Sequence, residues 1–95
     1  MIKVSVLYGP PEDPAAFEDH YANTHVPLAA KMPKVARFEA SKVLNDAPYY
    51  RIAELWFESQ EDLQASMGSE EGQATTADIP KFATGGATVV ISQVD

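Results

Sequence analysis

The chain of 95 residues contains no cysteine. It can therefore form no disulfide, no thiolate nucleophile and no cysteine-ligated zinc site. It also has no apolar run approaching the roughly 20 residues that a membrane-spanning helix needs. Its first residues lack the basic start, long apolar stretch and small-residue cleavage site of a signal peptide. We therefore expect a cytoplasmic protein without a membrane partner.

Basic residues are scarce: seven Lys and Arg stand against 14 Asp and Glu, which gives a formal net charge of −7. This charge disfavours nucleic acid and anionic membranes as partners, because both would repel the chain. Also missing are the phosphate-binding P-loop, the glycine fingerprint of dinucleotide-binding folds and the strained serine turn of α/β-hydrolases. The sequence thus offers no motif for nucleotide binding or for serine-based hydrolysis.

Hydrophobic residues make up 45% of the chain, which indicates a folded protein, and the length suits one domain over residues 1–95. A helix should begin at Asp13, after the first of four predicted strands. Two short helices should begin at Ser59 and Ser69, and Pro80 should break the second. This βαββαβ order predicts an α+β fold of ferredoxin-like topology, with a four-stranded antiparallel sheet and helices on one face. Alternating apolar residues place the strands at residues 2–8, 35–44, 49–58 and 87–94.

Residues 17–32 of the helix that begins at Asp13 contain both histidines of the chain. Pro27 lacks a backbone N–H, so this helix should bend or restart near residues 23–26. His25 lies at the edge of the apolar face of the helix and should point toward the element against which the helix packs. The members of that face recur at helical spacing: Phe17, Tyr21, Leu28 and Met32.

His25 is the candidate catalytic residue. The ordinary pKa of histidine lies near physiological pH, and a place on a packed face would suit the ring to act as a general base. Tyr21, one helical turn earlier, is the candidate proton donor or orienting partner. The alternative is a structural histidine that hydrogen-bonds backbone groups freed near Pro27. His20 is five residues from His25, so the two rings should diverge, His20 should be exposed, and a metal site is not expected.

The other candidate binding residues are aromatic or stand out by their charge. Tyr8 and Trp56 could line a pocket for a hydrophobic ligand, and the alternative for such residues is core or interface packing. Glu54 falls between apolar neighbours on a predicted strand face, where it would need a basic partner or have a raised pKa. Both faces of that strand carry large apolar side chains, and the helices can cover only one. The uncovered face predicts a homodimer joined through the sheets.

The run Tyr21-x3-His25-x-Pro27-Leu28 resembles the EthD family, named for ethyl tert-butyl ether degradation. This family belongs to the dimeric α+β barrels of ferredoxin-like topology. The resemblance implies a homodimer with a pocket between sheet and helices in each subunit. Relatives of this kind are associated with cofactor-free oxidation, isomerisation, cyclisation and dehydration of small organic molecules. Haem-binding relatives of the barrel need an axial histidine, for which only His20 or His25 is present, and no cofactor is expected.

Three functions are consistent with these features. The first is a cofactor-independent oxidoreductase or isomerase that degrades or tailors a small hydrophobic organic molecule, with His25 as the base. The second is a non-catalytic carrier that holds a pathway intermediate in the same pocket. The third is a structural module whose only product is the dimer. In the first function Tyr21 assists His25, and the substrate contacts are Tyr8, Leu28, Glu54 and Trp56.

Overall fold

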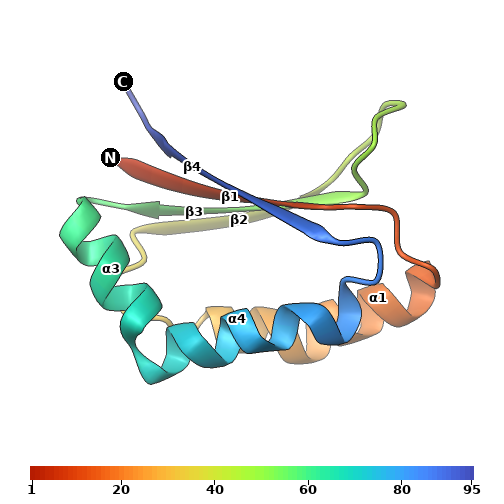
Figure 1. The fold of residues 1–95 in the computed structure, drawn as a ribbon, viewed down its shortest axis with the longest axis horizontal. Helices are drawn as coiled ribbons and strands as arrows, with labels where there is room; N and C mark the ends of the chain where they lie inside the picture. The colour runs from red at the N-terminus through yellow and green to blue at the C-terminus, as the bar shows by residue number, and fades with distance from the viewer.

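The computed structural model describes residues 1–95 and shows a four-stranded antiparallel sheet with the helices on one of its faces (Figure 1). The predicted α+β fold of ferredoxin-like topology is therefore confirmed. The first strand has its expected bounds and the other three are shorter, with residues 43–50 forming a longer connection between two of them. In spatial order the strands are β2 (Arg37–Lys42), β3 (Arg51–Phe57), β1 (Ile2–Tyr8) and β4 (Ala87–Gln93).

The helices form one layer below the sheet in Figure 1. As predicted, Asp13 caps the first helix, and its carboxylate accepts a hydrogen bond from the Ala16 N–H at 3.2 Å. None of the helices is both long and apolar enough to cross a bilayer. In chain order they are α1 (Pro14–His20), the π-helix η1 (Tyr21–His25), α2 (Val26–Ala29), α3 (Gln60–Gly68) and α4 (Glu70–Phe82).

Pro27 changes the first helical segment in a way that the sequence predicted only in part. The backbone widens into one turn of π-helix, η1, in which the Val26 N–H bonds the Tyr21 carbonyl. Because Pro27 has no N–H, one α-helical hydrogen bond is already missing at this point. A wider turn here therefore loses fewer backbone hydrogen bonds than it would elsewhere in a helix. The α-helix resumes at Val26, so the restart expected near residues 23–26 is confirmed.

Pro80 does not break the last helix, contrary to the expectation. Helix α4 continues through Pro80 to Phe82, and the Ala83 N–H bonds the Ile79 carbonyl at 2.9 Å. Phe82 is buried in the core. Burial of a phenylalanine side chain contributes about 1.5–3 kcal/mol, which offsets most of the cost of a proline in a helix.

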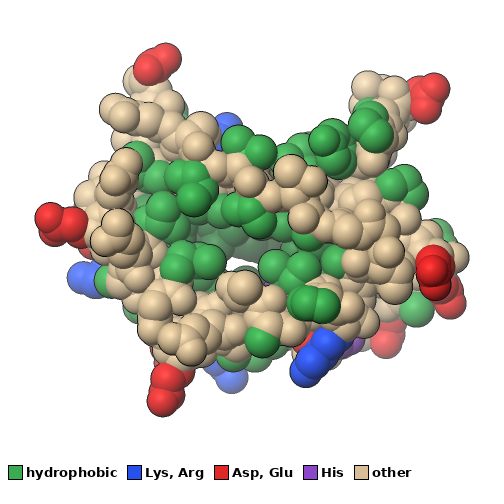
Figure 2. Space-filling model, in the orientation of Figure 1, with side chains coloured by type: hydrophobic (Ala, Val, Ile, Leu, Met, Phe, Trp, Pro, Cys, Tyr) green, Lys and Arg blue, Asp and Glu red, His purple; other side chains and the backbone are tan.

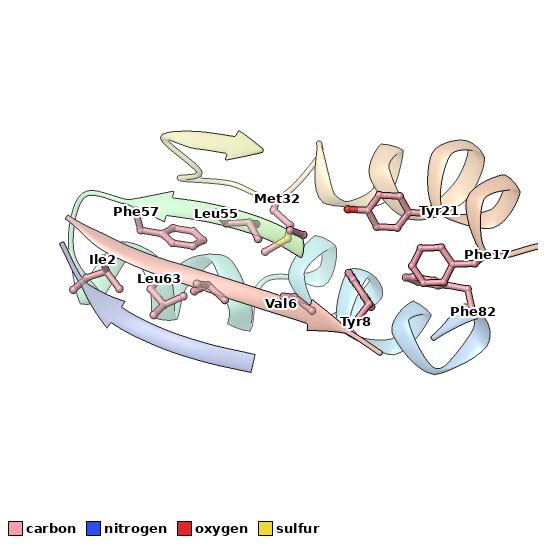
Figure 3. Close-up of a cluster of buried hydrophobic side chains, with 12 residues drawn as sticks. Ile2, Val6, Tyr8, Phe17, Tyr21, Met32, Leu55, Phe57, Leu63 and Phe82 are labelled. Atoms are coloured by element: carbon pink, nitrogen blue, oxygen red, sulfur yellow. The ribbon is translucent and has the colours of Figure 1, made fainter. Parts of the chain in front are cut away.

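The hydrophobic core lies between the sheet and the helix layer (Figure 3). Alternate residues of β1 and β3 point into it, and their neighbours point to the outer face of the sheet. One end of the core contains Phe57, which is fully buried, together with Ile2 and Leu63. The other end is aromatic, with ring centroids 5.1–5.8 Å apart among Tyr8, Phe17, Tyr21 and Phe82.

Helices α3 and α4 approach each other closely at Gly72. A Cβ atom at this position would overlap the Ser66 carbonyl oxygen and would lie 2.9 Å from the Cα of Met67. A Cβ atom at Gly68, in contrast, would have nothing within 4 Å. The contact between the two helices therefore requires glycine at position 72 and not at position 68.

We expect Gly72→Ala to lower the free energy of unfolding by about 1–3 kcal/mol, because the new methyl group must force the two helices apart. Gly68→Ala is the matched control and should leave stability unchanged or raise it by up to about 1 kcal/mol. Urea denaturation at a fixed chain concentration measures both effects. Equal stability of the two variants would contradict the close contact.

Candidate functional site

A cavity of about 100 Å³ lies between the sheet and the helices. Figure 2 shows hydrophobic side chains framing a hollow between these two layers. Twelve of the 15 residues that line the cavity are hydrophobic, and none is Lys, Arg, Asp or Glu. The ionisable side chains in its wall are those of Tyr8 and His25. The cavity is therefore suited to an apolar molecule that meets one imidazole and one phenol.

His25 is buried, with 5% of its surface exposed, so its predicted inward orientation is confirmed. Its Nδ1 atom lies 3.0 Å from Oδ2 of Asp78, which is 3% exposed and belongs to α4. An ionised carboxylate can only accept hydrogen bonds, so Nδ1–H is the donor. In the neutral ring this leaves a lone pair on Nε2, which makes no hydrogen bond within the chain. The geometry therefore selects the tautomer of His25 that accepts a proton at Nε2.

The charge states of this pair follow from its surroundings. Burial lowers the pKa of His25 below its ordinary value of 6.5, although the hydrogen bond and the charge of Asp78 oppose this effect. Burial alone would raise the pKa of Asp78, but the hydrogen bonds from His20 and His25 outweigh it and lower that pKa below 3.8. At neutral pH the pair is thus a neutral imidazole beside a carboxylate.

The structure overturns the expectation that His20 is an exposed side chain diverging from His25. Its Nε2 atom lies 2.9 Å from Oδ1 and 3.0 Å from Oδ2 of Asp78, and 29% of its side chain is exposed. The cause is the π turn: hydrogen bonds that join residues five apart place such residues nearly above one another. Both histidines consequently reach one carboxylate. No group of His, Asp or Glu side chains in the structure is arranged to hold a metal ion.

The two tyrosines predicted at the site occupy different positions. Tyr8 lines the cavity, and burial raises the pKa of its hydroxyl. Tyr21 is buried beside the cavity and packs on His25, with the ring centroids 5.7 Å apart and the planes inclined by 24°. Burial also raises the pKa of Tyr21, and its hydroxyl has no hydrogen-bond partner within the chain. Both side chains are therefore neutral phenols at physiological pH.

Three predicted contact residues do not line the cavity. Glu54 and Trp56 point to the outer face of the sheet, because the residues that alternate with them on β3 face the helices. Glu54 is part-exposed and pairs with Lys3 at 3.2 Å, so it has a basic partner, which was one of the two alternatives considered for it. Leu28 is also part-exposed, since the π turn shifts the helix by one residue and places Ala29 in the cavity wall instead.

Asp78 is the residue that the sequence analysis missed. The sequence feature that could have indicated its burial is its spacing: Asp78 lies three positions after Thr75 and four before Phe82, which places the three residues on one helix face. All three residues of that face are buried. The expected break at Pro80 concealed the pattern, because it placed Asp78 at the end of a short helix.

The sequence profile of the EthD domain matches residues 9–86. The chain belongs to the EthD family. It is 41% identical over 96 residues to an 11.0 kDa protein in the thcB-thcC intergenic region of Rhodococcus erythropolis, an alignment that covers 97% of this chain and 93% of that protein. The crystal structure of an EthD family protein from Bacillus halodurans is 33% identical, with a TM-score of 0.95 over 100% of this chain and 99% of the other.

Two less similar crystal structures share the fold alone. A dimeric ferredoxin-like protein from Thermobifida fusca is 14% identical, with a TM-score of 0.76 over 98% of this chain and 90% of the other. SnoaB, a cofactor-independent oxygenase from Streptomyces nogalater, is 12% identical, with a TM-score of 0.72 over 98% of this chain and 91% of the other. The ferredoxin-like fold of this chain thus occurs in a dimer and in an enzyme that uses no cofactor.

The lowered pKa of His25 links the stability of the protein to pH. As the pH falls, the unfolded chain takes up a proton on this ring near its ordinary pKa of 6.5, before the folded protein does. Stability should therefore decrease as the pH falls through 6.5 and level off once folded His25 is protonated. The lowered pKa of Asp78 contributes stability above its ordinary value of 3.8, and this contribution is lost at lower pH.

We expect His25→Gln to flatten the pH dependence of stability between about pH 7.5 and about pH 5.5, because glutamine does not titrate. The measurement is the midpoint of urea denaturation across this range for both proteins at equal chain concentration. An identical slope in the wild type and the variant would show that His25 is not the residue responsible.

Proposed function

We propose that this chain is a small enzyme that acts on a neutral, hydrophobic organic molecule and uses His25 as a general base. The observation that carries the proposal is the state of that imidazole. Asp78 binds its Nδ1 atom, while Nε2 makes no hydrogen bond within the chain and the ring lines an apolar cavity. A ring held in this way can take a proton at Nε2, and the carboxylate stabilises the imidazolium that forms.

The cavity wall supports a neutral substrate. No cationic side chain lines it, so an anion would lose its hydration there without gaining a partner. A phenol, an enol or a ketone with an activated C–H bond meets these requirements. Transfer of its proton to Nε2 of His25 leaves the phenolate, enolate or carbanion. Return of that proton to another carbon of the substrate is an isomerisation. Transfer of an electron from the anion to molecular oxygen begins a cofactor-free oxidation.

Tyr8 and Tyr21 contribute to the proposed reaction in different ways. Tyr8 stays protonated because burial raises its pKa, so its hydroxyl can donate a hydrogen bond to a substrate oxygen in the cavity. Tyr21 does not line the cavity but stacks on the imidazole of His25. Its role in the proposal is to orient that ring.

The second candidate is a carrier that holds a hydrophobic pathway intermediate without changing it. The predominantly apolar cavity wall supports this function as well, because burial of apolar surface is sufficient for binding. The two candidates differ in whether His25 moves a proton.

The assembly belongs to the same proposal: two copies of the chain pair through the outer faces of their sheets. The helices leave this face uncovered, and the connection between β2 and β3 and the C-terminal segment rise beyond it on opposite sides (Figure 1). The face combines part-exposed apolar residues such as Ile52 with the Lys3–Glu54 ion pair. A mixture of this kind is typical of protein interfaces.

The catalytic proposal predicts exchange of an acidic C–H of a bound ligand for deuterium in D₂O. Ligand-observed NMR over small cyclic ketones and aromatic diketones first identifies a compound that binds. The wild type should then exchange its proton, and His25→Gln should slow the exchange by about 10²–10⁴-fold while binding persists, because the base is lost and the cavity is kept.

Thr24→Ala is the matched control for this measurement, since Thr24 lies in the same π turn but is exposed. It should exchange the ligand at the wild-type rate. Undiminished exchange in His25→Gln would overturn the role of His25 as a base. Saturable binding without exchange in the wild type would favour the carrier.

For the assembly, we expect sedimentation velocity at micromolar concentration to show a dimer. Ile52→Asp should convert it to a monomer, because an unpaired carboxylate would be buried between the sheets. Ala65→Asp, on the exposed side of α3, should remain dimeric. A wild-type monomer under these conditions would contradict the proposed interface.

A further inference from the structure

Two imidazoles bind the same buried carboxylate. His20 approaches Asp78 through Nε2, at 2.9 Å from Oδ1 and 3.0 Å from Oδ2, while His25 approaches Oδ2 through Nδ1 at 3.0 Å. The ring of Phe82 lies against both, with centroids 5.2 Å from His20 and 4.7 Å from His25. The two histidines are thus held by one charged group and one aromatic group from α4.

The two rings differ in their access to water. His25 lines the apolar cavity, and 6% of its side chain is exposed. His20 lines a separate surface hollow, and 29% of its side chain is exposed. Asp78 lies between them with 4% of its side chain exposed. The row His20–Asp78–His25 therefore leads from the solvent to the cavity.

We propose that His20 is a positioning residue of the site, which holds the Asp78 carboxylate in place for His25 and links the protonation of His25 to the solvent. The inference rests on the proposed function, because it assigns His20 a part in the action of the same base. His20 does not touch the cavity, so it acts only through Asp78.

The protonation of His20 and that of His25 are linked because the two rings share a single negative charge, that of Asp78. One carboxylate can balance one imidazolium, so a proton on His20 disfavours a second proton on His25, and the reverse holds equally. When His20 is neutral, its Nε2–H donates to Asp78, and the full negative charge supports proton uptake by His25. When His20 is protonated, that support is reduced and His25 becomes a weaker base.

The other ionisable groups around the row form no ion pair with either imidazole. Tyr8 lies near Asp78 and is neutral, because burial raises its pKa. Arg51 lies over the ring of Tyr21 and is paired with Glu18. No acidic side chain other than Asp78 bonds either imidazole. The groups that share the surface hollow with His20 are Glu12, Asp13, Asp19 and Lys81.

The test is an NMR titration of the protein without ligand, in which His20 and His25 are the only two histidines. His20→Gln keeps a donor for Asp78 but cannot carry a charge, whereas His20→Ala removes both. We expect the pKa of His25 to be higher in His20→Gln than in the wild type by about half a unit to one unit. The downfield resonance of the hydrogen-bonded Nδ1–H of His25 should persist in His20→Gln and weaken in His20→Ala.

An identical titration of His25 in the wild type and in His20→Gln would overturn the linkage, and an unchanged Nδ1–H resonance in His20→Ala would overturn the positioning role. Because the titration needs no substrate, it is independent of the proposed function. If the titrations of His20 and His25 are linked but the protein catalyses no C–H exchange, the role of His20 is supported and the proposed catalytic function is contradicted.

Discussion

The buried carboxylate of Asp78 is the group on which the rest of the site depends. It joins α4 to the end of α1 and to η1 through its bonds with His20 and His25. A buried carboxylate without partners would be strongly unfavourable, and the two imidazoles supply the donors that it needs. In return, Asp78 selects the tautomer of His25 in which Nε2, on a ring that lines the cavity, is unprotonated. Stability and proposed chemistry thus depend on the same charged group.

The π turn of η1 determines which side chains meet that carboxylate. Residues five apart diverge on an α-helix, whereas a turn closed between such residues brings them to one side. His20 and His25 reach Asp78 for this reason. The same turn moves Ala29 into the cavity wall and turns Leu28 away from it. One local irregularity beside Pro27 therefore decides both the charge network and the shape of the cavity.

Strand β3 contributes side chains to both faces of the sheet. Ala53, Leu55 and Phe57 form part of the cavity wall, while the intervening side chains form part of the outer face. On that face Lys3 and Arg37 lie over the ring of Trp56. Membership of the EthD family accounts for this architecture, but a fold by itself does not specify a reaction. The chemistry has to be argued from the ionisable groups beside the cavity.

By itself, the sequence determined the order of the elements, the start of α1 directly after its cap Asp13 and the inward orientation of His25. These features depend on strand alternation, helix capping and helical spacing, which are local patterns. Only the tertiary structure revealed Asp78 as the partner of His20 and His25, which are 58 and 53 positions away. It also decided that Glu54 faces outward beside Lys3. Such contacts join distant segments, so the packing of the whole chain selects them and no local pattern encodes them.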